Sequence, residues 1–146
     1  MAIVKYIKLN EKAIVPTYGT EYAAGADIYA LLDEDVIIEP GETVMIHTGI
    51  AMQIPDGTAA FIFARSGTAT KRGLAPANKV GVIDSDYRGE VMVPIHNHSK
   101  TVQQIAVGER IAQMVIMPYI KAEFLESETL DETDRDQKGF GSTGVK

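Results

Sequence analysis

Two aspartates and a tyrosine lie close together in residues 81–91, which read GVIDSDYRGEV. Asp84 and Asp86 are two positions apart, and Tyr87 follows them directly. Valines flank a cluster of Asp, Ser and Gly residues, which is typical of two strands joined by a polar turn, so we expect a β-hairpin. An aspartate at its tip can accept a proton from water as a general base, although an ordinary polar turn has the same composition.

Arg65 is a candidate for binding phosphate, because a short helix is predicted directly after it. Ser66 is a favourable N-cap residue and Gly73 a favourable residue just past a helix end, with Lys71 and Arg72 in the last turn. Free N–H groups at the start of such a helix point at an anion, and a guanidinium can hold phosphate oxygens in a fork. A capped surface helix with a solvated arginine is the alternative interpretation.

A glycine-rich segment, GFGSTG, occupies residues 139–144 and formally matches G-x-G-x-x-G. It does not predict a dinucleotide fold, because that motif needs a helix after it and only two residues follow. Such a tail can still fold over a phosphate chain, with Ser142 and Thr143 donating hydrogen bonds and Phe140 stacking on a base. A disordered tail is the alternative. Residues 121–138 are acidic and poor in apolar side chains, so we expect a mobile arm.

Other polar side chains can also take part in binding. Asn78 offers a donor and an acceptor to a pyrimidine edge, although a plain turn residue is the simpler interpretation. Gln113 lies within an apolar strand, where a polar side chain on the inner face needs a partner. His96 and His98 share a strand face as a metal-binding pair would, but no glutamate follows them at the spacing of such a site, so a polar strand end is the better account.

Composition limits the class of protein. A chain of 146 residues is the size of one domain, and its 14 basic and 20 acidic residues give a net charge of −6, so we expect no nucleic-acid partner. Without cysteine there is no disulfide, thiolate zinc site or thiol nucleophile. No segment approaches the roughly 20 apolar residues of a membrane span, so we expect no membrane association and a cytoplasmic location.

Short apolar stretches rich in β-branched residues and separated by turn signals predict an all-β sandwich or barrel. The predicted strands are residues 3–9, 36–38, 43–54, 58–64, 79–83, 90–97, 102–107 and 110–119, and Asp27 stands where another strand begins. We expect two parts, a β-barrel domain over residues 1–120 and a C-terminal arm over residues 121–146 that carries the glycine-rich motif.

Five segments resemble, in order, the five sequence motifs of the homotrimeric dUTPases, nucleotide pyrophosphatases that convert dUTP to dUMP. They are residues 24–28, 65–67, 81–89 and 108–113, and Arg135 with residues 139–144. Five motifs in the family's order make the match specific. The resemblance implies a jelly-roll-like dUTPase β-barrel with one short helix and a flexible C-terminal arm, assembled as a homotrimer.

The resemblance also assigns catalytic roles. Asp84 looks like the residue that activates a water for attack on the α-phosphorus of dUTP, and Gln113 like a residue beside that phosphate and water. Asp27 resembles a residue that helps to hold Mg²⁺ through bound water, since Mg²⁺ keeps much of its hydration. The ring of Tyr87 is expected against the deoxyribose, where it leaves no room for a 2′-hydroxyl. Such an enzyme keeps uracil out of DNA and supplies dUMP for dTMP synthesis.

The remaining substrate contacts follow the same resemblance. The hairpin backbone and Asn78 are expected to read the uracil, and the second motif and the arm to bind the phosphates. The implied substrate-binding residues are Arg65, Ser66, Gly67, Asn78, Val82, Ile83, Tyr87, Met92, Arg135, Phe140, Gly141, Ser142 and Thr143. Each site is expected to take its first, second and fourth motifs from one subunit, its hairpin from another and its arm from the third.

Two alternatives and one departure stay open. A dCTP deaminase of the same fold generally lacks the glycine-rich arm, and a non-enzymatic nucleotide sensor does not need Asp84. The departure lies in the arm, where the family's fifth motif usually has glycines among the residues after its arginine and this chain has Asp136, Gln137 and Lys138. Asp136 would repel the phosphates there, and Lys138 would offset that repulsion.

Overall fold

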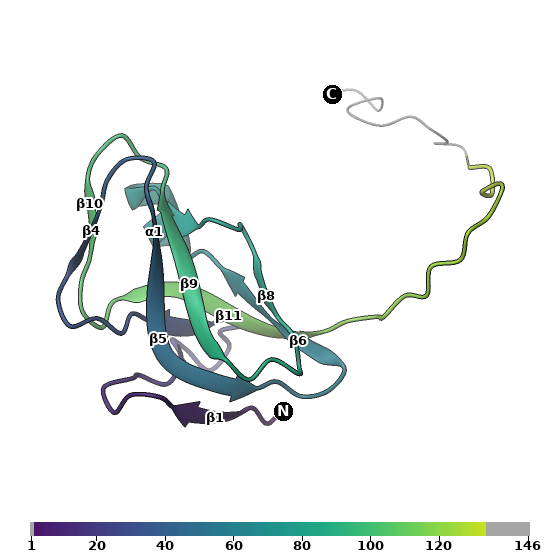
Figure 1. Ribbon diagram of the computed structural model, residues 1–146, viewed down its shortest axis with the longest axis horizontal. Helices are drawn as coiled ribbons and strands as arrows, with labels where there is room; N and C mark the ends of the chain where they lie inside the picture. The colour runs from purple at the N-terminus through teal and green to yellow at the C-terminus, as the bar shows by residue number, and fades with distance from the viewer. Residues whose placement is uncertain (1, 134–146) are drawn as a thin grey trace.

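The computed structural model describes residues 2–133, and their regular secondary structure consists of strands with one short helix (Figure 1). The elements in chain order are β1 (Lys5–Lys8), β2 (Thr17–Tyr18), β3 (Ala26–Tyr29), β4 (Val36–Ile38), β5 (Thr43–Gln53), β6 (Thr58–Phe63), α1 (Ser66–Arg72), β7 (Leu74–Pro76), β8 (Gly81–Ile83), β9 (Glu90–Asn97), β10 (Gln103–Ile105) and β11 (Arg110–Pro118). The predicted all-β class with one short helix is confirmed. The sequence does not predict β2 and β7, because two or three residues are too few to show an alternating pattern.

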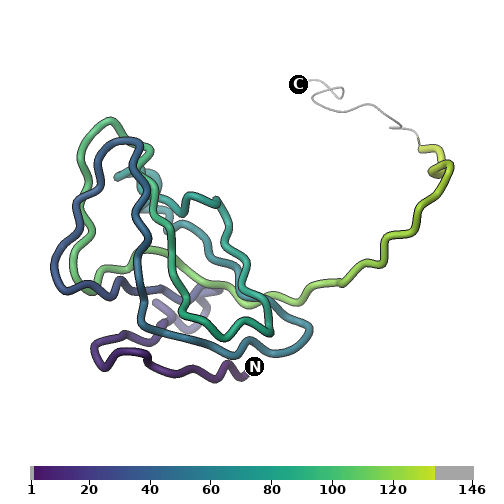
Figure 2. Tube along the Cα trace, in the orientation of Figure 1, coloured from purple at the N-terminus to yellow at the C-terminus, as the bar shows by residue number. Residues whose placement is uncertain are grey.

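Antiparallel pairing joins the strands into two main sheets. One sheet has the order β1-β5-β9-β7, the other has the order β2-β3-β11-β6-β8, and β10 pairs with β4 in a separate two-stranded ribbon. Figure 2 shows the paired β5 and β9 segments running side by side through the body of the molecule. The loops that join one sheet to the other can therefore bring polar side chains next to residues of both sheets at the surface.

A continuous aliphatic core joins the two sheets. Burial alternates along β9, where Val93 and Ile95 are fully buried and Met92 between Val91 and Val93 is 40% exposed. These side chains pack in one cluster with Ile46 of β5 and Ile62 of β6. Each such burial stabilises the fold by about 1.5–3 kcal/mol, so the sheets form a firm frame for the loops at their ends.

The helix α1 begins one residue earlier than the sequence predicts. Arg65, with φ −80° and ψ 135°, is the N-cap residue, and Ser66 is the first helical residue, so the predicted Ser66 N-cap is wrong. The predicted end is confirmed, since Gly73 has φ 68° and its N–H donates to the Ala69 carbonyl. Arg65 has the extended backbone that an N-cap residue adopts, so Ser66 lies inside the first turn and its side chain does not cap the helix.

The predicted β-hairpin around Asp84 is also wrong. β8 pairs with β6 in the five-stranded sheet, whereas β9 pairs with β5 and β7 in the four-stranded sheet, so residues 84–89 cross from one sheet to the other. The predicted polar turn itself is confirmed, since the Tyr87 N–H donates to the Asp84 carbonyl at 3.2 Å. Local turn chemistry does not decide which partner each flanking strand takes, because long-range burial decides it.

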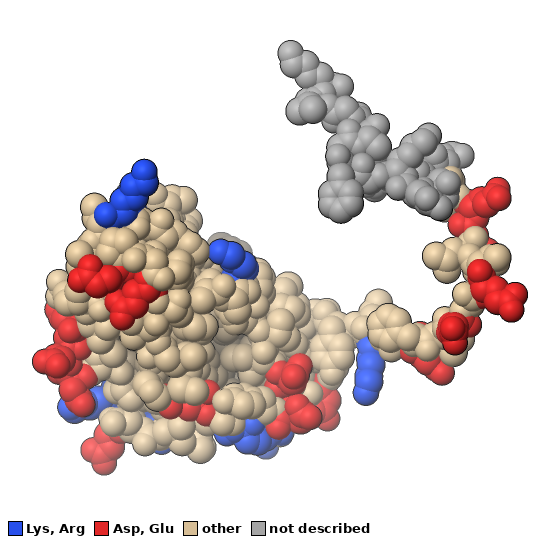
Figure 3. Space-filling model, turned by 45° about the horizontal axis from the view of Figure 1, so that its top comes forward, with Lys and Arg blue, Asp and Glu red and all other residues tan. Residues whose placement is uncertain are grey.

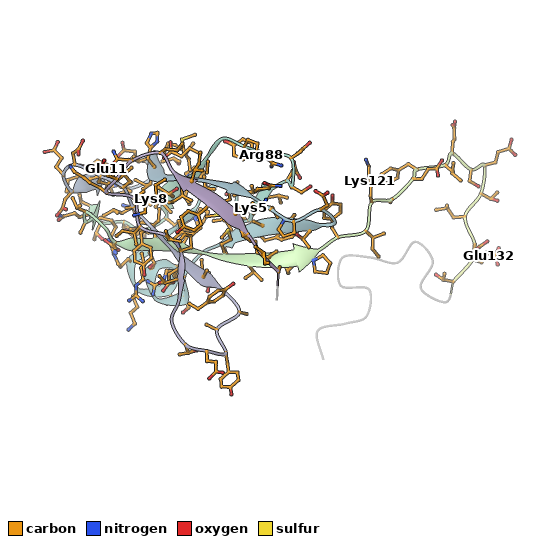
Figure 4. All side chains as sticks on the ribbon, turned by 90° about the horizontal axis from the view of Figure 1, so that it is seen from below. Lys5, Lys8, Glu11, Arg88, Lys121 and Glu132 are labelled. Carbon is orange, nitrogen blue, oxygen red and sulfur yellow. The ribbon has the colours of Figure 1, made fainter. Side chains whose placement is uncertain are left out.

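Residues 119–133 contain no helix or strand and extend away from the body (Figures 1 and 2). Acidic side chains line this segment in Figure 3, and Lys121 and Glu132 mark its two ends in Figure 4. Its large aliphatic and phenyl side chains are almost fully exposed, including Ile120 at 96% and Phe124 at 95%. No helix within residues 2–133 has the length and apolar character needed to cross a membrane.

Candidate active site

A pocket of about 320 Å³ lies where the loop of residues 84–89 meets the two sheets. Six residues predicted from the sequence line it: Asn78, Val82, Ile83, Asp84, Tyr87 and Met92. Met45, Glu90, Val91 and Pro94 complete the lining. The structure therefore brings the predicted residues of the third motif together with Asn78 and with Met92 of β9, so the pocket draws on two sheets rather than on one hairpin.

Asp84 carries the free carboxylate of this pocket. Asp84 follows the last residue of β8 and is exposed, and its carboxylate makes no hydrogen bond or ion pair within residues 2–133. Asp86, two residues further on, does not line the pocket. The structure thus separates the two aspartates of the loop, and only Asp84 is placed to act on a molecule bound in the pocket.

Tyr87 is held on the wall of the pocket by two neighbours. Its hydroxyl donates to the carbonyl oxygen of Glu90 at 3.0 Å, and its ring lies across the backbone of Gly89. Tyr87 remains 42% exposed and lines the pocket, so its side chain can contact a molecule bound there.

Glu90 connects the pocket loop to β5, and sequence reasoning did not select it. Its carboxylate accepts hydrogen bonds from the N–H groups of Gly49 at 2.7 Å and Thr48 at 3.2 Å, and it lies 2.8 Å from His47 Nδ1. Burial raises the pKa of Glu90, but the hydrogen bonds from His47, Gly49 and Thr48 outweigh it, so the pKa is lowered. Pairing shifts register between His47 and Ala51, and the Glu90 carboxylate binds the amides freed by that bulge.

The only sequence signal for this arrangement is a glycine inside a long apolar strand. Gly49 has φ +67°, and glycine within a strand often marks a bulge. The acidic partner lies 41 residues further along the chain, so no local pattern identifies it.

A second cluster of predicted residues forms around Asp27. Arg65 Nε donates to Asp27 Oδ1 at 2.7 Å, and Arg110 Nη1 donates to Asp27 Oδ2 at 3.0 Å. Strand pairing creates the cluster, since Gln113 of β11 pairs with Asp27 of β3 on one side and with Phe63 of β6 on the other. Arg65 follows Phe63 by two residues, so motifs distant in sequence meet here. Sequence reasoning missed Arg110.

Gln113 is held in this cluster by backbone groups. Its Nε2 donates to the Ala64 carbonyl at 2.9 Å. This is the hydrogen-bond partner that a polar side chain in an apolar strand needs. A Cβ at Gly25 would lie 2.7 Å from Gln113 Oε1, so only glycine leaves room for the amide in this position. Ser66 and Gly67 begin α1 directly beside this point.

The two clusters lie at opposite ends of β6. Ile83, which precedes Asp84, pairs with Ala60, whereas Gln113 pairs with Phe63. Residues rise about 3.3 Å along a strand, and neighbouring strands lie about 4.8 Å apart. Asp84 and Gln113 are separated by four residues in the direction of β6 and by two strand spacings across the sheet, so their backbones lie ~16 Å apart. A separation of this size is large for two side chains that act on the same phosphorus atom.

No group of three or more His, Asp or Glu side chains within residues 2–133 could hold a metal ion. Mg²⁺ is commonly held by one or two carboxylates together with substrate phosphates and water, so such a group is not required for it. Both Asp27 oxygens accept from arginines, and each retains a lone pair for a water-mediated contact. The Asp27 carboxylate is therefore compatible with water-mediated binding of a Mg²⁺ ion that is coordinated by a triphosphate.

The histidine pair has a polar rather than a metal-binding environment. His96 Nδ1 lies 2.8 Å from Thr43 Oγ1, and the His96 and His98 rings meet edge to face at 4.4 Å. Desolvation, with further contributions from Lys79 and His96, lowers the pKa of His98. The predicted site residues of the arm, namely Arg135, Phe140, Gly141, Ser142 and Thr143, lie outside the described residues.

Comparison with known proteins identifies the family. A model of the dUTPase family matches residues 11–144. The chain belongs to the dUTPase family. This dUTPase is 50% identical to the deoxyuridine 5'-triphosphate nucleotidohydrolase of Desulfitobacterium hafniense (strain DSM 10664 / DCB-2) over 143 residues, covering 97% of this chain and 95% of the relative.

Two solved structures resemble this dUTPase in fold. The dUTPase of Staphylococcus bacteriophage 80alpha with dUPNHPP has a TM-score of 0.88 at 29% identity and covers 98% of this chain and 99% of its own. A variant dUTPase of phage phi11 of S. aureus has a TM-score of 0.79 at 27% identity, covering 89% and 99%, and its structure reveals the coordination of a structural Mg(II) ion. The predicted jelly-roll-like dUTPase fold is thus confirmed.

Proposed function

We infer that this dUTPase hydrolyses dUTP to dUMP and pyrophosphate. The observation that carries the inference is the pocket at residues 84–89, where a free carboxylate, an amide and an aromatic ring gather in a chain of the dUTPase family. The relative from Desulfitobacterium hafniense carries the corresponding name. This reaction removes dUTP, which keeps uracil out of DNA, and it supplies dUMP for dTMP synthesis.

In the proposed reaction Asp84 accepts a proton from a water molecule as that water attacks the α-phosphorus. A bond forms between the water oxygen and phosphorus, and the bond from phosphorus to the bridging oxygen breaks, so pyrophosphate leaves. Arg65, Ser66, Gly67 and Gln113 are proposed to hold the phosphate chain, where fixed donors stabilise the charge of the transition state. Asp27 supports this by fixing the Arg65 guanidinium at 2.7 Å.

The pocket is proposed to bind the nucleoside. Asn78, with the backbone of Val82 and Ile83, reads the uracil edge, and Met92 lines the same space. The Tyr87 ring packs against the deoxyribose and leaves no room for a 2′-hydroxyl. The arm residues Arg135, Phe140, Gly141, Ser142 and Thr143 are proposed to close over the base and phosphates.

We propose a homotrimer in which each site combines the pocket of one subunit, the Asp27 cluster of a second and the arm of the third. The separation of ~16 Å between Asp84 and Gln113 supports it, because a general base must lie within hydrogen-bond reach of its water. The exposed apolar side chains of residues 119–133 support it as well, since a second chain could cover them. The division into a barrel, residues 1–120, and an arm, residues 121–146, belongs to the same proposal.

Mg²⁺ is the proposed cofactor, held by Asp27 through water and by the phosphates of the substrate. When bound, it would neutralise phosphate charge and orient the triphosphate. A cytoplasmic location is proposed from the substrate, because nucleotide pools for DNA synthesis are found there.

The decisive experiment incubates the protein with Mg²⁺ and, separately, dUTP, dCTP, dTTP and UTP, and measures pyrophosphate and ammonia. Pyrophosphate from dUTP alone is expected. Ammonia from dCTP would identify a deaminase, and binding of dUTP without any product would identify a nucleotide sensor. Asp84→Asn serves as the inactive reference, and Asp86→Asn, a substitution of the same chemistry in the same loop, is the matched control.

A further inference from the structure

Gly89 lies directly beneath the ring of Tyr87. A Cβ atom built at position 89 would lie 2.6 Å from Tyr87 Cζ and 3.0 Å from Cε2, and still closer to the hydroxyl oxygen. Carbon atoms in proteins do not approach one another this closely without displacement. Any side chain at this position would therefore push the Tyr87 ring away from its place on the pocket wall.

The backbone itself does not require glycine here. Gly49 and Gly73 have φ of +67° and +68°, in the region that other residues rarely adopt, whereas Gly89 is not among the positive-φ residues. Alanine could thus take the same backbone conformation at position 89. Contact with the Tyr87 ring is the feature of this site that glycine permits and alanine does not.

The hydroxyl end of the ring is also held by a hydrogen bond. The Tyr87 hydroxyl donates to the Glu90 carbonyl at 3.0 Å, and the Glu90 carboxylate accepts from the amides of Gly49 and Thr48. The ring is therefore tied through Glu90 to the bulge of β5. Figure 4 labels Arg88, the residue that links Tyr87 to Gly89, on this loop.

We propose that Gly89 is a positioning residue for sugar selectivity. Its missing Cβ lets the hydroxyl end of the Tyr87 ring lie against the loop, in the position that accepts a deoxyribose and rejects a ribose. This inference deepens the proposed function and rests on it, because it assumes that Tyr87 faces the sugar. Gly89 touches no substrate in this account and acts only through Tyr87.

The test is a double-mutant cycle on selectivity, the ratio of kcat/KM for dUTP to kcat/KM for UTP. A packed pocket rejects a single added hydroxyl by about a hundredfold at most, so Gly89→Ala is expected to lower the ratio by about tenfold. Tyr87→Ala is expected to lower it at least as much. Adding Gly89→Ala to Tyr87→Ala should change the ratio no further, because the ring through which Gly89 acts is already gone.

Gly19→Ala is the matched control, since a Cβ at Gly19 meets no atom within 4 Å and its selectivity should equal that of the wild type. If Gly89→Ala folds poorly in a thermal melt, the Gly89→Ala/Tyr87→Ala double variant should recover the Tm of Tyr87→Ala, because the ring that the new Cβ meets is gone. A double variant that stays as unstable as Gly89→Ala would overturn the proposal.

An unchanged ratio in Gly89→Ala, or a further loss in the double variant, would overturn the proposal. Failure of the proposed function looks different, since the wild type itself would then release no pyrophosphate from dUTP. Calorimetric titration with non-hydrolysable imido analogues of dUTP and UTP measures the same discrimination without turnover. Equal weakening of both analogues by Gly89→Ala would also count against the proposal.

Discussion

At the scale of single residues, the chemistry of the site depends on which polar groups are already engaged. Asp27 has both oxygens paired with arginines and Gln113 has its amide bound to Ala64, whereas the Asp84 carboxylate has no partner within residues 2–133. A carboxylate that must accept a proton from water is more useful free than paired. The contrast supports Asp84 as the base and Asp27 as a residue that orients Arg65.

Asp84→Asn keeps the size of the side chain and removes the base. We expect kcat to fall at least about a hundredfold, the lower range for loss of a general base, with KM little changed. Steady-state kinetics with dUTP measures both constants. Asp86→Asn is the control and should retain wild-type turnover, so equal losses in the two variants would remove Asp84 from the proposed role.

Gly25→Ala should act through Gln113. The new Cβ would lie 2.7 Å from Gln113 Oε1, so the amide must turn away from its present position. We expect kcat to fall about tenfold, because a displaced donor stabilises the phosphate charge less well. Gly19→Ala again provides the control, and full activity in Gly25→Ala alongside a defective Gln113→Ala would contradict the positioning of Gln113 by Gly25.

At the scale of elements, Glu90 holds the pocket loop against the bulge of β5. Its pKa is lowered in the folded chain, so it contributes stability that is fully present above its unfolded value near 4.5. That contribution is lost as the pH falls through the folded pKa. The charged form of Glu90 is therefore needed at neutral pH and is progressively lost in acid.

Glu90→Gln should accordingly lower Tm at pH 7, and the difference from the wild type should shrink as the pH falls below about 4.5. Differential scanning calorimetry between pH 3 and pH 7 measures it. Glu11→Gln, at an exposed glutamate labelled in Figure 4, is the control and should leave Tm unchanged at every pH. A Glu90→Gln difference that is constant across this range would show that the charge of Glu90 does not stabilise the loop.

The sequence predicts the elements better than it predicts their partners. The long strands could be predicted because the alternation of Val93, Ile95 and their neighbours is local. The supposed hairpin at Asp84 was wrong, because the choice of β6 and β5 as partners depends on burial across the whole core. Arg110 and Glu90 were missed for the same reason, since their partners lie 83 and 41 residues away. The motif resemblance supplied the candidate residues that spacing alone could not.

At the scale of the whole molecule, the proposed site exists only between chains. Two inactive variants should therefore restore each other, one with Asp84→Asn in the pocket and the other with Gln113→Ala in the cluster. After joint unfolding and refolding in equal amounts, roughly a quarter of sites should combine an intact pocket with an intact cluster, since each choice has a probability of one half. Turnover of dUTP measures the recovery.

Each variant refolded alone is the control for this mixing and should stay inactive. Native mass spectrometry confirms that mixed assemblies have formed. If mixed assemblies are present and no activity returns, the pocket and the cluster do not serve one site, and the trimeric arrangement proposed from their separation is wrong.

The placement of Asp84 and Gln113 at opposite ends of β6 also determines how the rate depends on the amount of protein. A single chain would have no activity. At chain concentrations low enough for the assembly to dissociate, the rate should therefore rise with more than the first power of chain concentration. A newly made chain would then leave the nucleotide pool untouched until it meets its partners. Initial rates measured over serial dilutions test this, and strict proportionality down to concentrations where sedimentation shows only monomers would mean that one chain suffices.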